Sequence, residues 1–159
     1  MLGGLLMYEK TGIVTSIYPD RCTARVKFED SDDLISAELQ IVVRGSLKNK
    51  DYWMPKVGEH VFCIFTKQKK GYILGSLYSE ETPPPVTDES KRYMEFEDGT
   101  TIEYDTHTHT LSIQCTGTIN IEATGNVNVK GDVIADGISL KNHTHMGVHG
   151  ETSPPIGGG

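Results

Sequence analysis

The sequence has few apolar residues and lacks any long apolar run. Hydrophobic residues make up 36% of its 159 positions, whereas glycine is frequent, with 17. This composition is poor for a compact globular core and favours an elongated or repetitive shape. The chain has no apolar stretch near the roughly 20 residues of a membrane-spanning helix, and its start, MLGGLLMYEK, lacks the features of a secretory signal.

Cysteine is also scarce. The three cysteines, Cys22, Cys63 and Cys115, are odd in number and widely spaced. Disulfide frameworks use paired cysteines in oxidising compartments, so this pattern indicates synthesis in a reducing cytoplasm.

Basic residues are nearly missing from the second half. Residues 93–159 hold 2 Lys or Arg and 9 Asp or Glu, whereas residues 1–92 hold 13 of each, so the net charge of −7 belongs to the second half. Phosphate backbones repel such an acidic surface, and we therefore expect no nucleic-acid partner. The asymmetry also indicates two parts with different roles.

A proline-rich stretch, SEETPPPVTDESKR, separates the two halves at residues 79–92. Consecutive prolines are stiff and cannot join a sheet ladder, so the stretch predicts a semi-rigid linker over 81–92. The alternative is a proline-rich loop inside one domain. Residues 1–8 are interpreted as an N-terminal extension.

Residues 9–80 predict a small β-barrel. Cys22, Ala24, Val26 and Phe28 alternate with polar residues, as on a strand with one buried face. The apolar run 61–65 suits a strand buried on both faces. Five strands are expected in all, at 11–18, 21–29, 34–43, 60–66 and 71–78. Five short strands with one longer connection predict an all-β, OB-fold barrel.

The second half shows an unusually long period of two. From Leu111 to Ala135 the odd positions are apolar or glycine, and the even positions are polar with Ile134 as the exception. Such alternation predicts extended chain with one dry and one wet face. One straight strand of this length would reach about 80 Å, far beyond ordinary strands. Before this run, strands are expected at 93–97 and 100–104, around an Asp-Gly turn, with a second turn near 105–109.

Glycines at regular intervals predict that this run is divided into short strands. Gly117, Gly125, Gly131 and Gly137 recur every six to eight residues on the dry phase, where a missing Cβ permits a bend. A β-sandwich half or a single-chain solenoid are the alternatives, but the latter would have a tiny core and open edges. Three identical chains wound about one axis would bury the dry face and pair every edge. We therefore predict a trimeric, intertwined triple-stranded β-helix, with a shaft over 93–140.

Three histidines lie close together in NHTHMGVHG, residues 142–150. His143 and His145 are two residues apart, so on extended chain their side chains point the same way. Two imidazoles alone hold a metal poorly. In a trimer each chain would contribute two histidines, which gives six ligands in all. For His107 and His109 we expect solvated turn or strand residues, for His60 a barrel position, and for His149 a surface or supporting role.

Several motifs resemble the phage baseplate assembly protein V family, the central spikes of contractile tails. In the barrel they are GIVTSIYPDRCTARVKF, YWMPKVGEHVFCIF and GYILGSLY, and before the shaft there is an F-x-D-G-T-x-I-x-Y-D motif. Near residue 150, His143, His145, Val148 and Pro155 match the family's apex motif, whereas Gly150 and Thr152 are shifted by about one residue from their places in that motif. The resemblance implies an apex over 141–159 in which three copies of His143 and His145 give six nitrogens to one structural iron. Imidazole suits such divalent metals, whereas zinc prefers four ligands.

The resemblance also implies a function. We expect a homotrimeric, membrane-piercing spike of a virion or other extracellular contractile particle, docked through its barrel to the baseplate hub and tail tube, with its tip against the target cell envelope or outer membrane. It would be neither an enzyme nor a binder of a small-molecule substrate. The alternatives are an OB-fold binding module and a small metallohydrolase with a histidine metal site.

Overall fold

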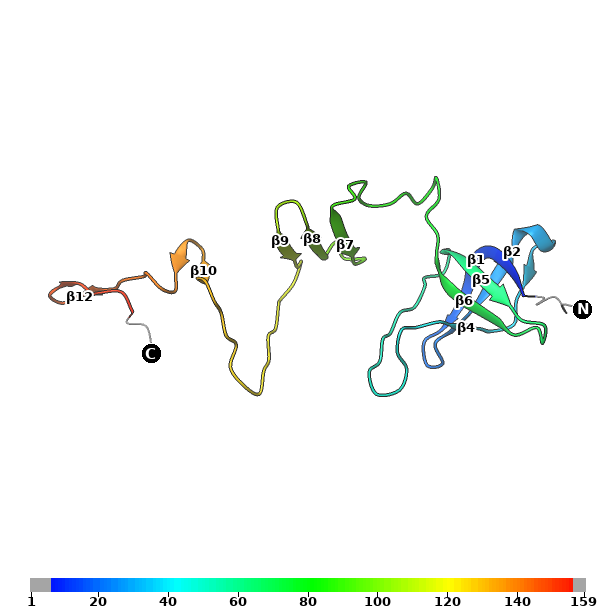
Figure 1. The fold of residues 1–159 in the computed structure, drawn as a ribbon, viewed down its shortest axis with the longest axis horizontal. Coiled ribbons are helices and arrows are strands. Elements are labelled where there is room, and N and C mark those ends of the chain that lie inside the picture. Colours follow the sequence, from blue (N-terminus) through cyan, green and yellow to red (C-terminus); the bar gives the residue numbers. More distant parts are fainter. Residues whose placement is uncertain (1–6, 156–159) are drawn as a thin grey trace, which may run out of the picture. The chain divides into compact units, whose positions relative to one another are not determined.

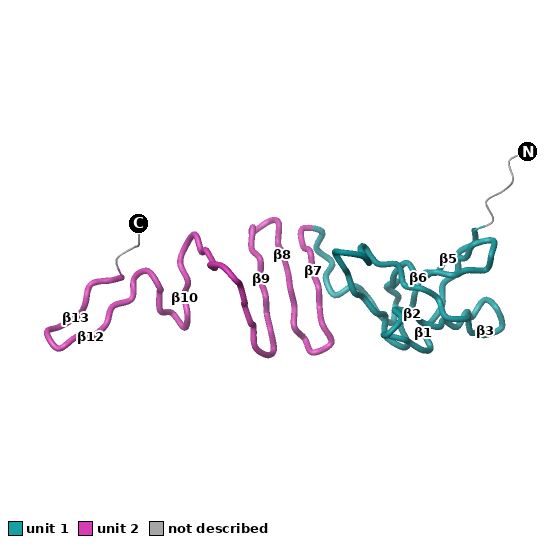
Figure 2. Tube along the Cα trace, turned by 90° about the horizontal axis from the view of Figure 1, so that it is seen from below, with its two compact units in different colours: residues 1–89 teal, residues 90–159 magenta. Residues whose placement is uncertain are grey.

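A computed structural model describes residues 7–155 of the chain, which divides into two compact units, residues 1–89 and 90–159 (Figure 2). The part it describes is all-β apart from one short 3-10 helix, η1 (Glu29–Ser31). No helix in residues 7–155 is long and apolar enough to cross a membrane. The all-β class predicted from alternation is confirmed.

The first unit is a closed β-barrel (Figure 1). Its strands are β1 (Tyr8–Tyr18), β2 (Thr23–Phe28), β3 (Leu34–Ile35), β4 (Leu39–Ile41), β5 (His60–Phe65) and β6 (Gly71–Ser76). Strand β1 pairs with both β2 and β5, β6 pairs with β5 and, in parallel, with β4, and β4 pairs with β2. These five strands close the ring, an arrangement compatible with an OB-fold. The short β3 pairs with β2 alone.

The predicted third strand, 34–43, is interrupted at Ser36. The Ser36 N–H donates to the Val26 carbonyl at 2.9 Å, and the Val26 N–H donates to Ser36 Oγ at 3.0 Å. The side chain thus takes a place that a backbone carbonyl would fill in a regular ladder. The strand therefore divides into β3 and β4.

Alternating side chains fill the barrel. The buried apolar residues are Val14, Ala24, Val26, Phe28, Leu39, Ile41, Val61, Cys63, Phe65 and Ile73. The predicted burial on both faces of 61–65 is wrong, because Phe62 and Ile64 are only half-buried on the outer side of β5. A barrel strand packs against the core on one face, whatever its outward residues are. Burial also raises the pKa of the Cys63 thiol to about 11, so this thiol stays protonated at neutral pH.

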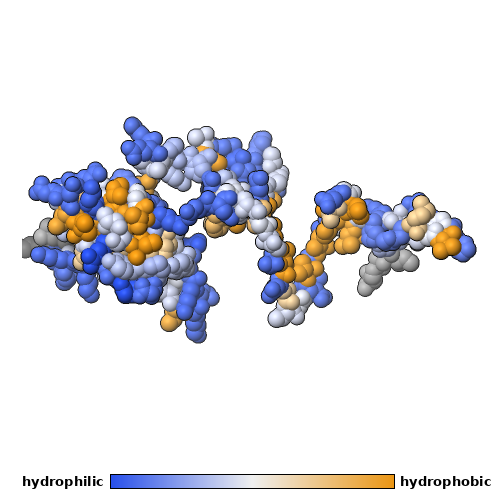
Figure 3. Space-filling model, turned by 180° about the vertical axis from the view of Figure 1, so that it is seen from behind, coloured by the Kyte–Doolittle hydropathy of each residue, from blue (hydrophilic) through white to orange (hydrophobic). Residues whose placement is uncertain are grey.

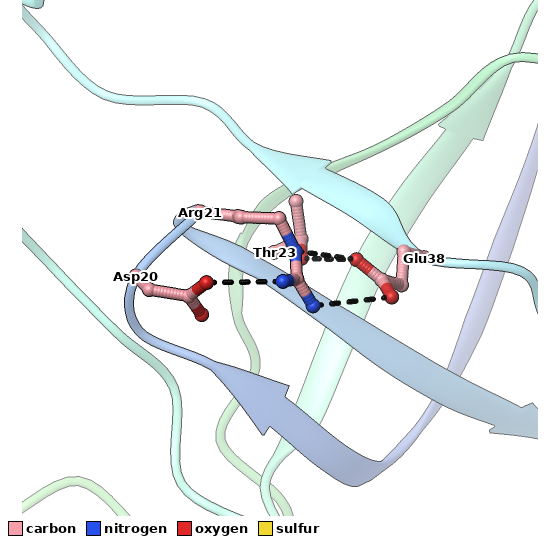
Figure 4. A network of polar contacts seen from close by, with 4 residues as sticks. All are labelled: Asp20, Arg21, Thr23 and Glu38. Atoms are coloured by element: carbon pink, nitrogen blue, oxygen red, sulfur yellow. Dashed lines mark hydrogen bonds and ion pairs between the residues drawn. The ribbon is translucent and has the colours of Figure 1, made fainter.

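A polar network fastens one end of β2 to the segment before β4 (Figure 4). Arg21 donates to both carboxylate oxygens of Glu38, at 3.2 and 3.4 Å, and the buried Thr23 donates to Glu38 at 2.9 Å. Arg21 also donates to Asp20 at 3.0 Å. The Thr23 hydroxyl, and then Arg21, hold the pKa of Glu38 below its usual value. The network supports the β2–β4 pairing of the barrel.

Replacing Gly12 by alanine is expected to destabilise the barrel strongly. A Cβ at Gly12 would lie 2.4 Å from the Lys27 carbonyl oxygen and 2.7 Å from Val26 Cγ1, and the backbone atom cannot give way. Overpacking of this kind costs about 1–3 kcal/mol or more. Thermal unfolding followed by circular dichroism measures the loss. Gly75→Ala is the matched control, since its Cβ meets nothing within 4 Å; equal melting temperatures for the two variants would contradict the packing argument.

The second unit begins with a three-stranded antiparallel meander. It consists of β7 (Lys91–Glu95), β8 (Thr101–Asp105) and β9 (Thr110–Gln114), close to the two strands and turn expected there. Aspartates hold both turns. Asp98 accepts hydrogen bonds from the N–H and hydroxyl of Thr100 and from the Thr116 hydroxyl, while Asp105 accepts from the N–H groups of His107 and Thr108.

The rest of this unit is extended and barely paired within the chain. Residues 115–133, all of them described, form no strand, so the short strands predicted between the glycines are not formed within the single chain. The bends predicted at Gly117, Gly125 and Gly131 are present. Two short hairpins follow, β10 (Ile134–Ala135) with β11 (Ile138–Ser139), and β12 (Met146–Gly147) with β13 (Gly150–Glu151). The first turns through Asp136 and Gly137, both with positive φ, as the type I′ turn of a two-residue hairpin requires.

The second unit has no core of its own. None of its described residues, 90–155, is buried. Its large apolar side chains lie open to solvent, and Figure 3 shows orange surface along the extended segment. They include Leu111, Ile113, Ile119, Ile121, Val127, Val129 and Val133 on the odd phase, and Ile134, Ile138 and Leu140 beyond it. A single chain therefore leaves the predicted dry face uncovered.

Candidate metal centre

His143 and His145 lie side by side between β11 and β12. Their ring centroids are 5.1 Å apart and the ring planes are nearly perpendicular, at 89°. The hydroxyl of Thr144, between them, instead donates to Glu151. The two-residue spacing thus brings both imidazoles together, as expected for extended chain.

The end of the β12–β13 hairpin anchors His145. The His145 N–H donates to Thr152 Oγ1 at 2.9 Å, and the Thr152 N–H donates back to the His145 carbonyl at 2.8 Å. Both bonds use backbone atoms of His145. Its imidazole therefore remains available for another partner.

His143 is oriented through its ring. Its Nδ1 lies 3.0 Å from the carbonyl oxygens of both Ser139 and Leu140. A carbonyl only accepts hydrogen bonds, so Nδ1 must carry the proton. In the neutral ring Nε2 then holds the free lone pair, which is the form in which imidazole binds a metal.

A single chain does not complete a metal site. Among residues 7–155 there is no group of three or more His, Cys, Asp and Glu side chains that could hold a metal ion. The donors that one chain offers are the imidazoles of His143 and His145, and the His143 ring is already in a tautomer that can bind a metal. Such a pair fits a metal shared between chains, to which each chain contributes two nitrogens.

The other histidines lie elsewhere. His107 and His109 are exposed in the turn after β8, where His109 has a φ of 56°, which agrees with their assignment as solvated turn residues. His60 is half-buried at the start of β5. His149 is exposed in the turn between β12 and β13, beside the fully exposed Val148.

Sequence reasoning missed the residues that orient His143. The alternation placed Asp132 on the polar phase of the run and gave Ser139 no role, yet both belong to the hydrogen-bond network around the histidine turn. Ser139 could have been found from the sequence, because a serine three residues before Asn142 has the spacing at which a hydroxyl caps a turn. The contribution of Asp132, eleven residues before His143, has no local signature.

Comparison with known proteins gives one informative likeness. No family model matches the chain. The chain is 25% identical over 108 residues to the spike protein of Escherichia phage P2, an alignment that covers 65% of this chain and 49% of that protein. The chain thus spans about half the length of this relative. A likeness to a spike protein agrees with the prediction of a structural protein that is not an enzyme.

Proposed function

We propose that this protein is the homotrimeric central spike of a contractile phage tail or a related injection particle. The observation that carries the proposal is the second unit, in which none of residues 90–155 is buried although large apolar side chains recur on one phase. Apolar surface of this extent marks an interaction site. The similarity to a phage spike protein supports the same reading.

Three copies of the chain are the partner that fits this surface best. The odd phase of Leu111–Ala135 provides a continuous dry face, and Gly117, Gly125 and Gly131 provide bends at intervals along it. In a threefold arrangement the odd residues fill the axis and the backbone groups of 119–131 pair with neighbouring chains, which satisfies hydrogen bonds that a single chain leaves to water. The product is a triple-stranded β-helix.

The histidine pair then becomes the structural metal centre of the apex. Three copies of His143 and His145 supply six imidazole nitrogens, a donor set suited to iron. A metal with every position filled by protein is structural rather than catalytic. Bound there, the ion would link three chain ends that have little packing of their own.

The remaining assignments follow from this arrangement. The barrel would dock to the baseplate hub and tail tube, and contraction would drive the apex through the target cell envelope. In chain order, the proposed parts are an N-terminal extension, an OB domain, a linker, a shaft and an apex. They span residues 1–8, 9–80, 81–92, 93–140 and 141–159, of which 1–6 and 156–159 lie outside the described residues. The particle would be a virion or another extracellular assembly. The spike protein itself would bind neither nucleic acid nor a small-molecule substrate.

Sedimentation equilibrium of the purified full-length protein tests this proposal. The expected mass is that of three 17.5-kDa chains. Circular dichroism on the same sample reports whether the β-structure is intact. A monomer with intact β-structure at micromolar concentration would overturn the spike assignment and favour the alternative function, an OB-fold binding module.

A further inference from the structure

The orientation of His143 depends on a single turn of chain. The His143 N–H donates to the Ser139 carbonyl at 3.0 Å, which closes a loop of five residues, and the Asn142 N–H donates to Ser139 Oγ at 2.9 Å. The two carbonyls that hold the Nδ1 proton, those of Ser139 and Leu140, belong to this turn. Any change in the turn therefore changes where the ring points and which nitrogen carries the proton.

One carboxylate, that of Asp132, connects this turn to the extended segment before the β10–β11 hairpin. Asp132 accepts a hydrogen bond from the Ser139 hydroxyl through Oδ2, and through Oδ1 from the N–H groups of Val133, at 2.8 Å, and Lys141, at 3.2 Å. Ser139 and Lys141 lie on either side of Leu140, so Asp132 restrains the turn on both sides of a carbonyl that contacts the ring. The Leu140 N–H also donates to the Val133 carbonyl at 2.8 Å.

We propose that Asp132, acting through Ser139, is a positioning residue that holds the His143 imidazole in its Nδ1-protonated tautomer with Nε2 free to bind a metal. This inference rests on the proposed function, since it concerns the histidine pair of the apex. Asp132 itself contacts neither imidazole. Its role is that of the outer partners of metal-binding histidines, whose loss typically weakens metal affinity about 10- to 100-fold.

The test compares three full-length variants. Asp132→Ala removes all three hydrogen bonds, whereas Asp132→Asn keeps an oxygen in place of Oδ1 for the two N–H donors. Asp98→Ala is the matched control, because Asp98 also accepts three hydrogen bonds at a turn of the same unit but contacts no residue of the histidine turn. Sedimentation confirms that each variant has the oligomeric state of the unaltered protein.

Two readouts are needed. Competition between metal-stripped protein and a chelator for iron(II) measures affinity, and long-range proton–nitrogen NMR of histidine-labelled, metal-free protein at about pH 8 measures the tautomer of neutral His143. We expect Asp132→Ala to weaken iron binding about 10- to 100-fold and to give a mixture of tautomers. Asp132→Asn should recover a large part of both, and Asp98→Ala should change neither.

The outcomes separate this inference from the function on which it rests. If the unaltered protein and Asp132→Ala bind iron equally well, or if Asp98→Ala loses as much affinity as Asp132→Ala, the positioning role is wrong while the metal centre stands. If the unaltered protein binds no iron, the metal centre is wrong. The NMR experiment then decides alone: an unchanged tautomer in Asp132→Ala overturns the positioning role, and a mixture supports it.

Discussion

Replacing Val127 by aspartate will prevent the chain from forming a trimer. In the single chain this side chain is 62% exposed, so a carboxylate there would cost little if the chain acted alone. In the proposed trimer Val127 lies on the dry phase, and the substitution places three carboxylates at one level of the axis. Each buried, unpaired ion costs several kcal/mol, which is comparable with the stability of a whole domain.

Sedimentation equilibrium reads out this prediction directly. The expected result is a loss of the species with the mass of three chains, and Ile121→Asp, which is on the same phase, should behave alike. Asn128→Asp is the matched control, since it adds the same charge one residue away on the wet phase and should leave the trimer intact. A Val127→Asp protein that remains trimeric with unchanged melting temperature would show that the odd phase is not the interface.

Replacing both His143 and His145 by alanine will remove the bound metal. Elemental analysis of the unaltered oligomer should find about one iron per three chains, because six imidazoles from two positions require three copies. The double variant loses every proposed ligand, so its iron content should fall to the level of a buffer blank. The barrel should keep its melting temperature, because its core contains neither residue.

The other histidine pair provides the control for this experiment. His107 and His109 have the same His-Thr-His spacing in the same unit but are exposed in the turn held by Asp105. Their double replacement by alanine should leave the iron content unchanged. Loss of the metal from this variant, with retention in the His143 and His145 variant, would move the site to the other pair. Retention of metal in both variants would refute a histidine site at either pair.

In the barrel, period-two alternation located strands but not what covers their two faces, and in residues 115–133 it did not lead to strands within the single chain. The pattern in 21–29 located β2 and its inward residues Ala24, Val26 and Phe28. The apolar run 61–65 located β5 but not its exposure, because a run of apolar residues looks the same whether one face or both are covered. The break at Ser36 was invisible as well, since it depends on a hydrogen bond to Val26 on another strand.

The histidine site was also predicted in part from the sequence. The spacing of His143 and His145 was enough to predict that their rings lie together, because extended chain repeats every two residues. The tautomer of His143 was beyond prediction, since it follows from two carbonyls in a turn that Asp132 restrains. The trimer and the metal remain predictions.

The sequence by itself determined the all-β class, the approximate positions of four barrel strands, β1, β2, β5 and β6, and the apolar phase of Leu111–Ala135, because each is a periodic property of neighbouring residues. Tertiary structure alone decided that β4 and β6 pair in parallel, with Ile41 opposite Ile73, and that Asp132 reaches the histidine turn. Both depend on contacts between residues distant along the chain. Such contacts are chosen by packing and hydrogen bonding in the folded protein, on which local alternation carries no information.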